Sequence, residues 1–175
     1  MRVLAAMLLA FAGMGLPARA WEGFAVPSAS APAAVEGFAW YRCWVRVPEA
    51  WRGQRLILTV GATAGVDETW FNGVRVAAHG SPPPFFSPPA SRVRRPAVIE
   101  EDLVRPGDWN LLALPFYDRG GAGAVTAGPV QLGAGDEALD LAGIWEFRPG
   151  DDPAWAQPGE DPAADYRTVR RELRA

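Results

Sequence analysis

The stretch AWYRCWVRVP, residues 39–48, has the alternation of a β-strand. Successive strand residues point to opposite faces of a sheet, so the two faces have different compositions. One face carries Tyr41, Cys43, Val45 and Val47. The other carries alternating aromatic and basic side chains, namely Trp40, Arg42, Trp44 and Arg46. The first set is typical of a sandwich core, whereas the second indicates either a ligand surface or a surface covered by another part of the protein.

Further short strands are predicted around this one. The alternating or apolar segments are 55–61, 69–76, 97–100, 109–117 and 125–132. The dipeptide Asn72-Gly73 divides the second of them into a hairpin, because both residue types tolerate positive φ. Five prolines between residues 80 and 91 exclude a central strand there. We therefore predict an all-β chain folded as an antiparallel β-sandwich of the jelly-roll kind.

The first 20 residues have the pattern of a signal peptide. Arg2 precedes an apolar run at residues 3–16, and Ala18-Arg19-Ala20 has the small-residue pattern of a cleavage site. The run is shorter than the ~20 residues of a membrane-spanning helix. We expect the mature chain to begin at Trp21 and to be periplasmic or secreted.

The charge and cysteine content exclude two classes of protein. The chain has 17 basic and 20 acidic residues, and removing Arg2 and Arg19 gives a net charge of -5. A mildly acidic chain with dispersed arginines lacks the basic surface of a nucleic-acid-binding protein. Its one cysteine, Cys43, cannot form an internal disulfide, so the fold is not a disulfide scaffold.

The order of the motifs resembles the sugar-binding jelly-roll domain of family 2 glycoside hydrolases. The motifs are AWYRCWVRVP, RLILTVG, ETWFNGVRVAAHG, LVRPGDWNLLALPFYD and GGAGAVTAGPVQLG, within residues 37–133. Similar galactose-binding-like domains occur in sialate O-acetylesterases and in the ectodomains of bacterial sensor proteins. The resemblance implies a carbohydrate-binding-like or scaffold module without catalytic residues, since the catalytic groups of those enzymes lie in separate domains.

The C-terminal region leaves two placements open. Residues 139–147, LDLAGIWEF, resemble the opening segment of the same domain, and that opener is missing before residue 37. The segment either begins a second domain or folds back to complete the first, and we favour the second placement because exposed aromatic side chains would be costly. We expect a signal peptide at 1–20, a sandwich at 21–133 and a C-terminal segment at 134–175, with 133–137 as the linker.

Five residues are candidates for a ligand site at one edge of the sandwich: Asp67, Trp70, Asn72, His79 and Asp118. Four of them have a structural alternative. Asn72 forms the hairpin turn, Asp67 caps a loop, Trp70 packs on a neighbouring strand, and His79 is an ordinary loop residue. For Asp118 the family resemblance supplies the interpretation, because it matches a position near the active-site side of the domain in some of those hydrolases.

The strand face with Trp40, Arg42 and Trp44 is the alternative ligand surface. Aromatic faces stack on sugar C–H groups, and arginine donates paired hydrogen bonds. We favour the covered interpretation, with the C-terminal segment or a partner domain over this face.

No catalytic or cofactor site is predicted. The acidic pairs Asp67-Glu68 and Asp151-Asp152 are adjacent in sequence, so they point to opposite faces of a strand or lie solvated in loops. No cofactor is expected, and calcium is left open with no ligands assigned.

A saccharide ligand and a longer parent protein are the expected partners, with no nucleic acid and no membrane span in this chain. The alternatives are an N-terminal fragment of a family 2 glycoside hydrolase or sialate O-acetylesterase, and the ectodomain of a bacterial membrane sensor.

Overall fold

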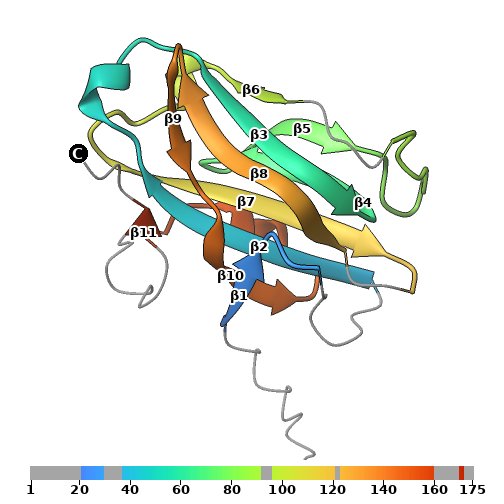
Figure 1. The fold of residues 1–175 in the computed structure, drawn as a ribbon. Coiled ribbons are helices and arrows are strands. Elements are labelled where there is room, and N and C mark those ends of the chain that lie inside the picture. Colours follow the sequence, from blue (N-terminus) through green and yellow to red (C-terminus); the bar gives the residue numbers. More distant parts are fainter. Residues whose placement is uncertain (1–20, 30–36, 92–95, 121–122, 160–169, 172–175) are drawn as a thin grey trace, which may run out of the picture.

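The computed structural model describes residues 21–29, 37–91, 96–120 and 123–159, and the backbone of 170–171. The predicted signal peptide lies outside these residues. Two β-sheets pack face to face, as Figure 1 shows. The fold prediction, an all-β antiparallel sandwich, is confirmed.

The larger sheet contains the strand AWYRCWVRVP at its centre. Its strands in spatial order are β1 (Glu22–Val26), β10 (Gly143–Pro149), β2 (Gly37–Arg46), β7 (Trp109–Asp118), β4 (Val66–Phe71) and β5 (Val74–His79). A two-residue strand, β11 (Arg170–Arg171), pairs with β2 in parallel. All other pairs in this sheet are antiparallel.

The smaller sheet covers one face of the larger sheet. Its order is β6 (Ala97–Ile99), β3 (Leu56–Ala64), β8 (Ala124–Ala134) and β9 (Glu137–Asp140). Three short 3-10 helices complete the described elements: η1 (Glu49–Trp51), η2 (Glu101–Leu103) and η3 (Pro153–Ala156). Among the described residues, no helix is long and apolar enough to cross a membrane.

The core lies between the sheets and uses the face of β2 that the alternation predicted. Tyr41 and Cys43 are opposite Leu114 and Leu112 of β7, and all four are buried. Leu58 belongs to the same apolar cluster from the smaller sheet. Each large apolar side chain in such a cluster contributes about 1.5–3 kcal/mol through its burial.

The N-terminal and C-terminal segments supply strands that complete the sandwich. β10 pairs with β2 on one side and with β1 on the other, and β9 pairs with β8 in the smaller sheet. Residues 137–149 therefore belong to the same sandwich as the strands before them. The linker predicted at 133–137 is instead a hairpin, with Gly135 and Asp136 as its turn, because β8 continues to Ala134. The sequence also did not predict β1.

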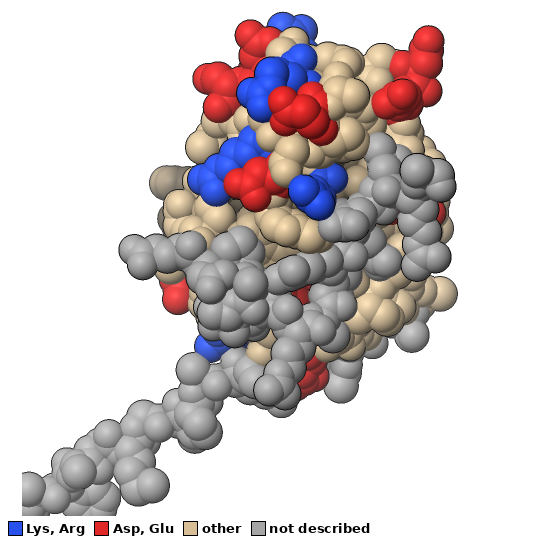
Figure 2. Space-filling model, turned by 90° about the vertical axis from the view of Figure 1, so that its left-hand side faces the viewer, with Lys and Arg blue, Asp and Glu red and all other residues tan. Residues whose placement is uncertain are grey.

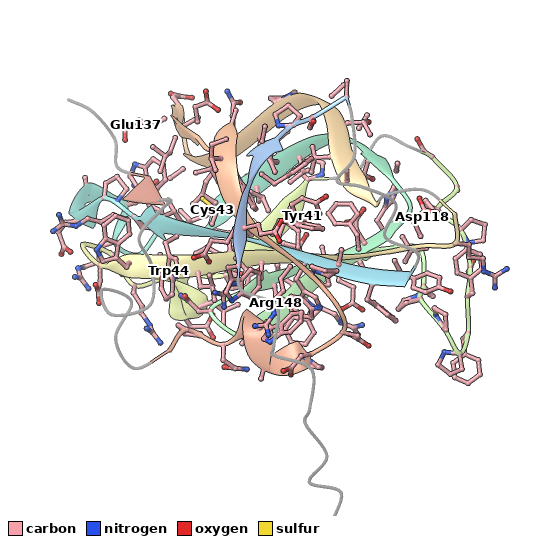
Figure 3. The ribbon with its side chains drawn as sticks, turned by 90° about the horizontal axis from the view of Figure 1, so that it is seen from below. Tyr41, Cys43, Trp44, Asp118, Glu137 and Arg148 are labelled. Atoms are coloured by element: carbon pink, nitrogen blue, oxygen red, sulfur yellow. The ribbon has the colours of Figure 1, made fainter. Side chains whose placement is uncertain are left out.

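The second face of β2 is covered. Trp40 and Trp44 are 2% exposed and Arg42 is 4% exposed. Figure 3 shows Trp44 on the opposite side of β2 from Tyr41 and Cys43. Trp40 packs with Ala156 and Trp155 of η3. These side chains form no open platform, and Trp40 and Arg42 contact the C-terminal segment, which agrees with the interpretation that we favoured from the sequence.

Candidate functional site

The five predicted site residues do not meet in one place. Asn72 has φ 49 and forms the β4–β5 turn with Gly73. Its amide group donates 2.8 Å hydrogen bonds to the Leu103 carbonyl and to Asn110 Oδ1. Its Oδ1 accepts a 2.9 Å bond from the Leu111 N–H. With every polar group of the side chain bonded internally, Asn72 shapes the hairpin and has no donor left for a ligand.

Asp67 and His79 face each other across the β4–β5 pair. The distance between His79 Nδ1 and Asp67 Oδ2 is 3.4 Å, and His79 Nδ1 is also 3.4 Å from Thr63 Oγ1. Asp67 is only 1% exposed. His79 ends β5 and is a part-buried strand residue, so its interpretation as an ordinary loop residue is wrong.

Asp118 lies at the end of β7, at the opposite end of the sandwich from Glu137 (Figure 3). Its Oδ1 accepts a 3.3 Å bond from the Gly120 N–H. It lines a hollow of about 340 Å³ together with Tyr117, Arg119 and Phe86. The Arg119 guanidinium carbon lies 4.0 Å from the centroid of the Phe86 ring, so this rim holds one acidic and one basic side chain.

Trp70 lines a second pocket, which we call the tryptophan pocket. It has a volume of about 180 Å³ and lies on the face of the larger sheet turned away from the smaller sheet. Strands β2, β4 and β7 form its floor, and the proline-rich loop and the chain after β10 form its sides. The lining residues are Phe38, Trp40, Val66, Glu68, Trp70, Pro82, Pro83, Pro115, Phe116, Tyr117, Asp151 and Pro153.

Five aromatic residues line the tryptophan pocket: Phe38, Trp40, Trp70, Phe116 and Tyr117. The ring centroids of Trp40 and Trp70 are 6.4 Å apart with an interplanar angle of 47°. Those of Phe38 and Tyr117 are 4.9 Å apart at 55°. Strand periodicity explains the grouping, because Phe38 and Trp40 are two residues apart on β2 and thus share a face. The pocket therefore offers ring surfaces from three adjacent strands.

Glu68 is held in place within this pocket. Its Oε2 accepts a 2.9 Å hydrogen bond from the Trp70 indole N–H. Its Oε1 accepts a 2.8 Å bond from Arg75 on the next strand. Trp70 and Glu68 are two residues apart on β4, which puts both on the pocket face. The carboxylate is consequently oriented by two donors before any ligand arrives.

Asp151 brings a second carboxyl group to the pocket. Burial raises the pKa of this carboxyl, and repulsion from Glu68 and Asp152 raises it further, while the Trp40 indole acts to lower it. Glu68 and Asp151 both line the pocket, so the fold brings two carboxyl groups to one site. Sequence reasoning missed this relationship because 83 positions separate the two residues in the printed sequence and the fold alone brings them together.

Trp40 contributes the unsatisfied polar atom of the pocket. Its Nε1 is buried, and no atom of the described structure accepts a hydrogen bond from it in normal geometry, although the Asp151 carboxyl lies close enough to interact. A ligand oxygen that accepts a well-aligned hydrogen bond from this N–H would therefore be favourable. The sequence could have indicated Trp40 only as part of the alternative face.

The tryptophan pocket and the Asp118 hollow are neighbours. Val66 and Tyr117 line both, so the two share a wall.

Among the described residues, no three His, Cys, Asp or Glu side chains are grouped as a metal site. In the part of Figure 2 where the residues are described, basic and acidic side chains lie side by side.

Comparisons with known proteins gave similarities to solved structures alone. No family model and no curated protein matches the chain. A β-D-glucuronidase of Dictyoglomus thermophilum is 19% identical with a TM-score of 0.41, over 58% of this chain and 19% of that one. A β-glucuronidase of Ruminococcus gnavus is 13% identical with a TM-score of 0.41, over 70% of this chain and 22% of that one. An α-L-rhamnosidase of Streptomyces avermitilis is 19% identical with a TM-score of 0.46, over 82% of this chain and 15% of that one. These neighbours are glycoside hydrolases, and the chain spans about a fifth of their length.

Proposed function

We propose that this chain is an exported, non-catalytic β-sandwich module that binds carbohydrate in the tryptophan pocket. The observation that carries the proposal is the combination in one pocket of the Trp40 and Trp70 rings, the oriented carboxylate of Glu68 and the unsatisfied Trp40 N–H. Sites for small molecules are typically apolar hollows with a few placed polar groups.

A sugar ring matches these groups physically. Its C–H face is apolar and packs on aromatic rings, while its hydroxyl groups donate to carboxylates and accept from an N–H. The volume of about 180 Å³ is below the ~300–1,000 Å³ of sites for drug-sized ligands, which suits a single ring. With few hydrogen bonds and water competing for each hydroxyl, we expect a Kd of about 0.1–1 mM.

The experiment is an NMR titration of the full chain with glucose, galactose and glucuronate. Binding of any of these sugars should shift the indole N–H signals of Trp40 and Trp70. Trp70→Ala should abolish the shifts, because it removes one ring and the donor that orients Glu68. The matched control is Trp109→Ala, since Trp109 begins β7 at the end of the strand away from the pocket. If no sugar shifts either indole signal in the folded wild-type chain, the proposal is wrong.

A second candidate function, glycoside hydrolysis, is favoured by the carboxyl pair. A carboxyl group with a raised pKa beside a second carboxylate is the arrangement that glycosidases use. Both oxygens of Glu68 already accept hydrogen bonds, which makes it a poor nucleophile. We therefore prefer carbohydrate binding to hydrolysis as the proposed function. Turnover of nitrophenyl glycosides by the wild-type chain, lost in Glu68→Gln and Asp151→Asn, would favour hydrolysis instead.

The place of the module in a longer protein is part of the proposal. The motif order resembles a domain that accompanies catalytic domains in family 2 glycoside hydrolases and sialate O-acetylesterases, and output domains in bacterial sensors. The coding sequence after the codon for Ala175 distinguishes these alternatives: a barrel or serine-hydrolase domain favours an enzyme, and a hydrophobic span favours a sensor.

A further inference from the structure

The charged residues that line the tryptophan pocket are all acidic. Its two charged lining residues, Glu68 and Asp151, are both acidic, and Asp152 adds a third acid beside them. Arg75 pairs with Glu68 from the rim, where its side chain is 57% exposed. Within the described part of the chain, Asp151 forms no ion pair. The pocket therefore keeps an excess of negative charge around aromatic walls.

We infer that the tryptophan pocket selects a sugar whose ring carries a protonated amine, a 2-amino-2-deoxy sugar, over neutral and anionic sugars. The inference rests on the proposed carbohydrate function and deepens it. It assigns the ammonium group to the Glu68–Asp151 side of the pocket and a ring or hydroxyl oxygen to the Trp40 N–H.

The aromatic walls favour a cation. The face of a tryptophan ring is electron-rich and attracts ammonium and guanidinium groups within about 6 Å. Nearby rings of this protein already do so, because the Arg42 guanidinium carbon lies 3.6 Å from the Trp21 ring centroid and that of Arg148 lies 4.3 Å from the Trp155 centroid. Trp155 in turn packs against Trp40, with ring centroids 6.2 Å apart. An ammonium group beside Trp40 and Trp70 would have the same type of environment.

Asp151 gives the pocket its preference for positive charge. Its ionised form is disfavoured by burial first and by the like charges of Glu68 and Asp152 second. A cation in the pocket offsets both effects, whereas the carboxylate of a uronic acid adds a further negative charge. The buried Trp40 N–H sets a second requirement, because it interacts with Asp151 without a hydrogen bond of normal geometry and an ammonium group offers it no acceptor. A ligand that carries both an ammonium group and oxygen acceptors satisfies the two requirements together.

The test is an NMR titration of the full chain with four matched probes: glucosamine, N-acetylglucosamine, glucose and glucuronate. At a pH of about 6.5 the carboxyl groups of reference peptides are ionised, and the amine of glucosamine is largely protonated. We expect glucosamine to bind about fivefold to tenfold more tightly than glucose. N-acetylglucosamine, which has lost the charge, should bind like glucose, and glucuronate should bind most weakly. Added salt should reduce the advantage of glucosamine.

Two variants locate the effect. Asp151→Asn should bring the ratio of the affinities for glucosamine and glucose to about one, because the amide keeps an acceptor oxygen without the charge. Asp118→Asn, in the neighbouring hollow, should leave the advantage unchanged. Circular dichroism and thermal melting of both variants check that each remains folded.

The outcomes separate this inference from the proposed function. Equal affinity for glucose and glucosamine in the wild-type chain overturns the amine preference and leaves carbohydrate binding standing. Binding of cyclohexylamine as tight as that of glucosamine overturns carbohydrate recognition and leaves the cation preference standing. If neither the four sugars nor cyclohexylamine shifts the Trp40 and Trp70 signals, the amine preference and carbohydrate binding are both overturned.

Discussion

The guanidinium group of Arg42 lies 3.0 Å from the carboxylate of Glu146, and both side chains are buried. The two residues are directly opposite each other in the β2–β10 pair. Arg42 also donates from Nη1 to the Trp155 carbonyl at 3.3 Å and stacks on the Trp21 ring. One arginine thus connects the central strand to the C-terminal segment and to Trp21, the first described residue.

Breaking this buried pair should strongly destabilise the fold. We expect Glu146→Ala to lower the free energy of unfolding by about 3–5 kcal/mol, because it leaves the Arg42 charge buried without its partner. Chemical denaturation measures the loss. The control is Arg55→Ala, which breaks the exposed Arg55–Glu100 pair and should cost at most about 1 kcal/mol. Equal losses in the two variants would contradict the buried role of Arg42 and Glu146.

Trp145 should be the residue through which β10 stabilises the core. Its side chain is fully buried, and its indole N–H donates a 2.8 Å bond to the Leu141 carbonyl. Trp145→Ala should cost about 3–5 kcal/mol through the cavity that it leaves. Ile144→Ala, on the opposite and exposed face of the same strand, should change stability by less than about 0.5 kcal/mol.

Truncation after Gly133 should leave an aggregating product, and a truncated chain with the wild-type melting temperature would disprove the contribution of β9 and β10.

Tyr41 should make the protein sensitive to alkaline pH. Burial raises the pKa of its phenol, whose O–H donates a 3.1 Å bond to the Gly123 carbonyl. A group with a raised folded-state pKa contributes stability that is complete below its unfolded pKa of about 10 and is lost as the pH rises above that value. The chain contains no lysine, so few other groups titrate in this range.

Thermal melting across alkaline pH checks the role of Tyr41. The melting temperature of the wild type should fall above pH ~10, and Tyr41→Phe should show a smaller fall. Tyr117→Phe is the matched control and should keep the wild-type slope. The same slope in wild type and Tyr41→Phe would count against Tyr41 as the cause.

Export should produce a chain that begins with Trp21. The Ala18-Arg19-Ala20 pattern predicts cleavage at that point. In the structure the Trp21 ring contacts Trp155, with ring centroids 5.5 Å apart, and lies under the Arg42 guanidinium. N-terminal sequencing of the protein recovered from the periplasm or the medium checks this. Recovery of the intact chain from the cytoplasm, still starting at Met1, would refute export.

The alternation of residues 39–48 determined the local structure of β2 and the existence of two faces. The residue pattern also predicted the strands that became β3, β4, β5, β6, β7 and β8, and the Asn72-Gly73 turn. These features depend on strand periodicity and on the φ preferences of single residues, and short stretches of sequence are enough to predict both.

Tertiary structure decided which contacts the second face of β2 makes. Nothing in the sequence near Trp40 and Arg42 indicates that Glu146 and Trp155, more than 100 positions away, cover them. The sequence likewise did not indicate that Glu68 and Asp151, which are far apart in the chain, line one pocket. It also did not indicate that Asp67 and Asp118 lie in different parts of the fold. Alternation determines which side chains share a face, but the pairing of distant strands and the closure of the chain over the sheet determine which of them become core, pocket or ion pair.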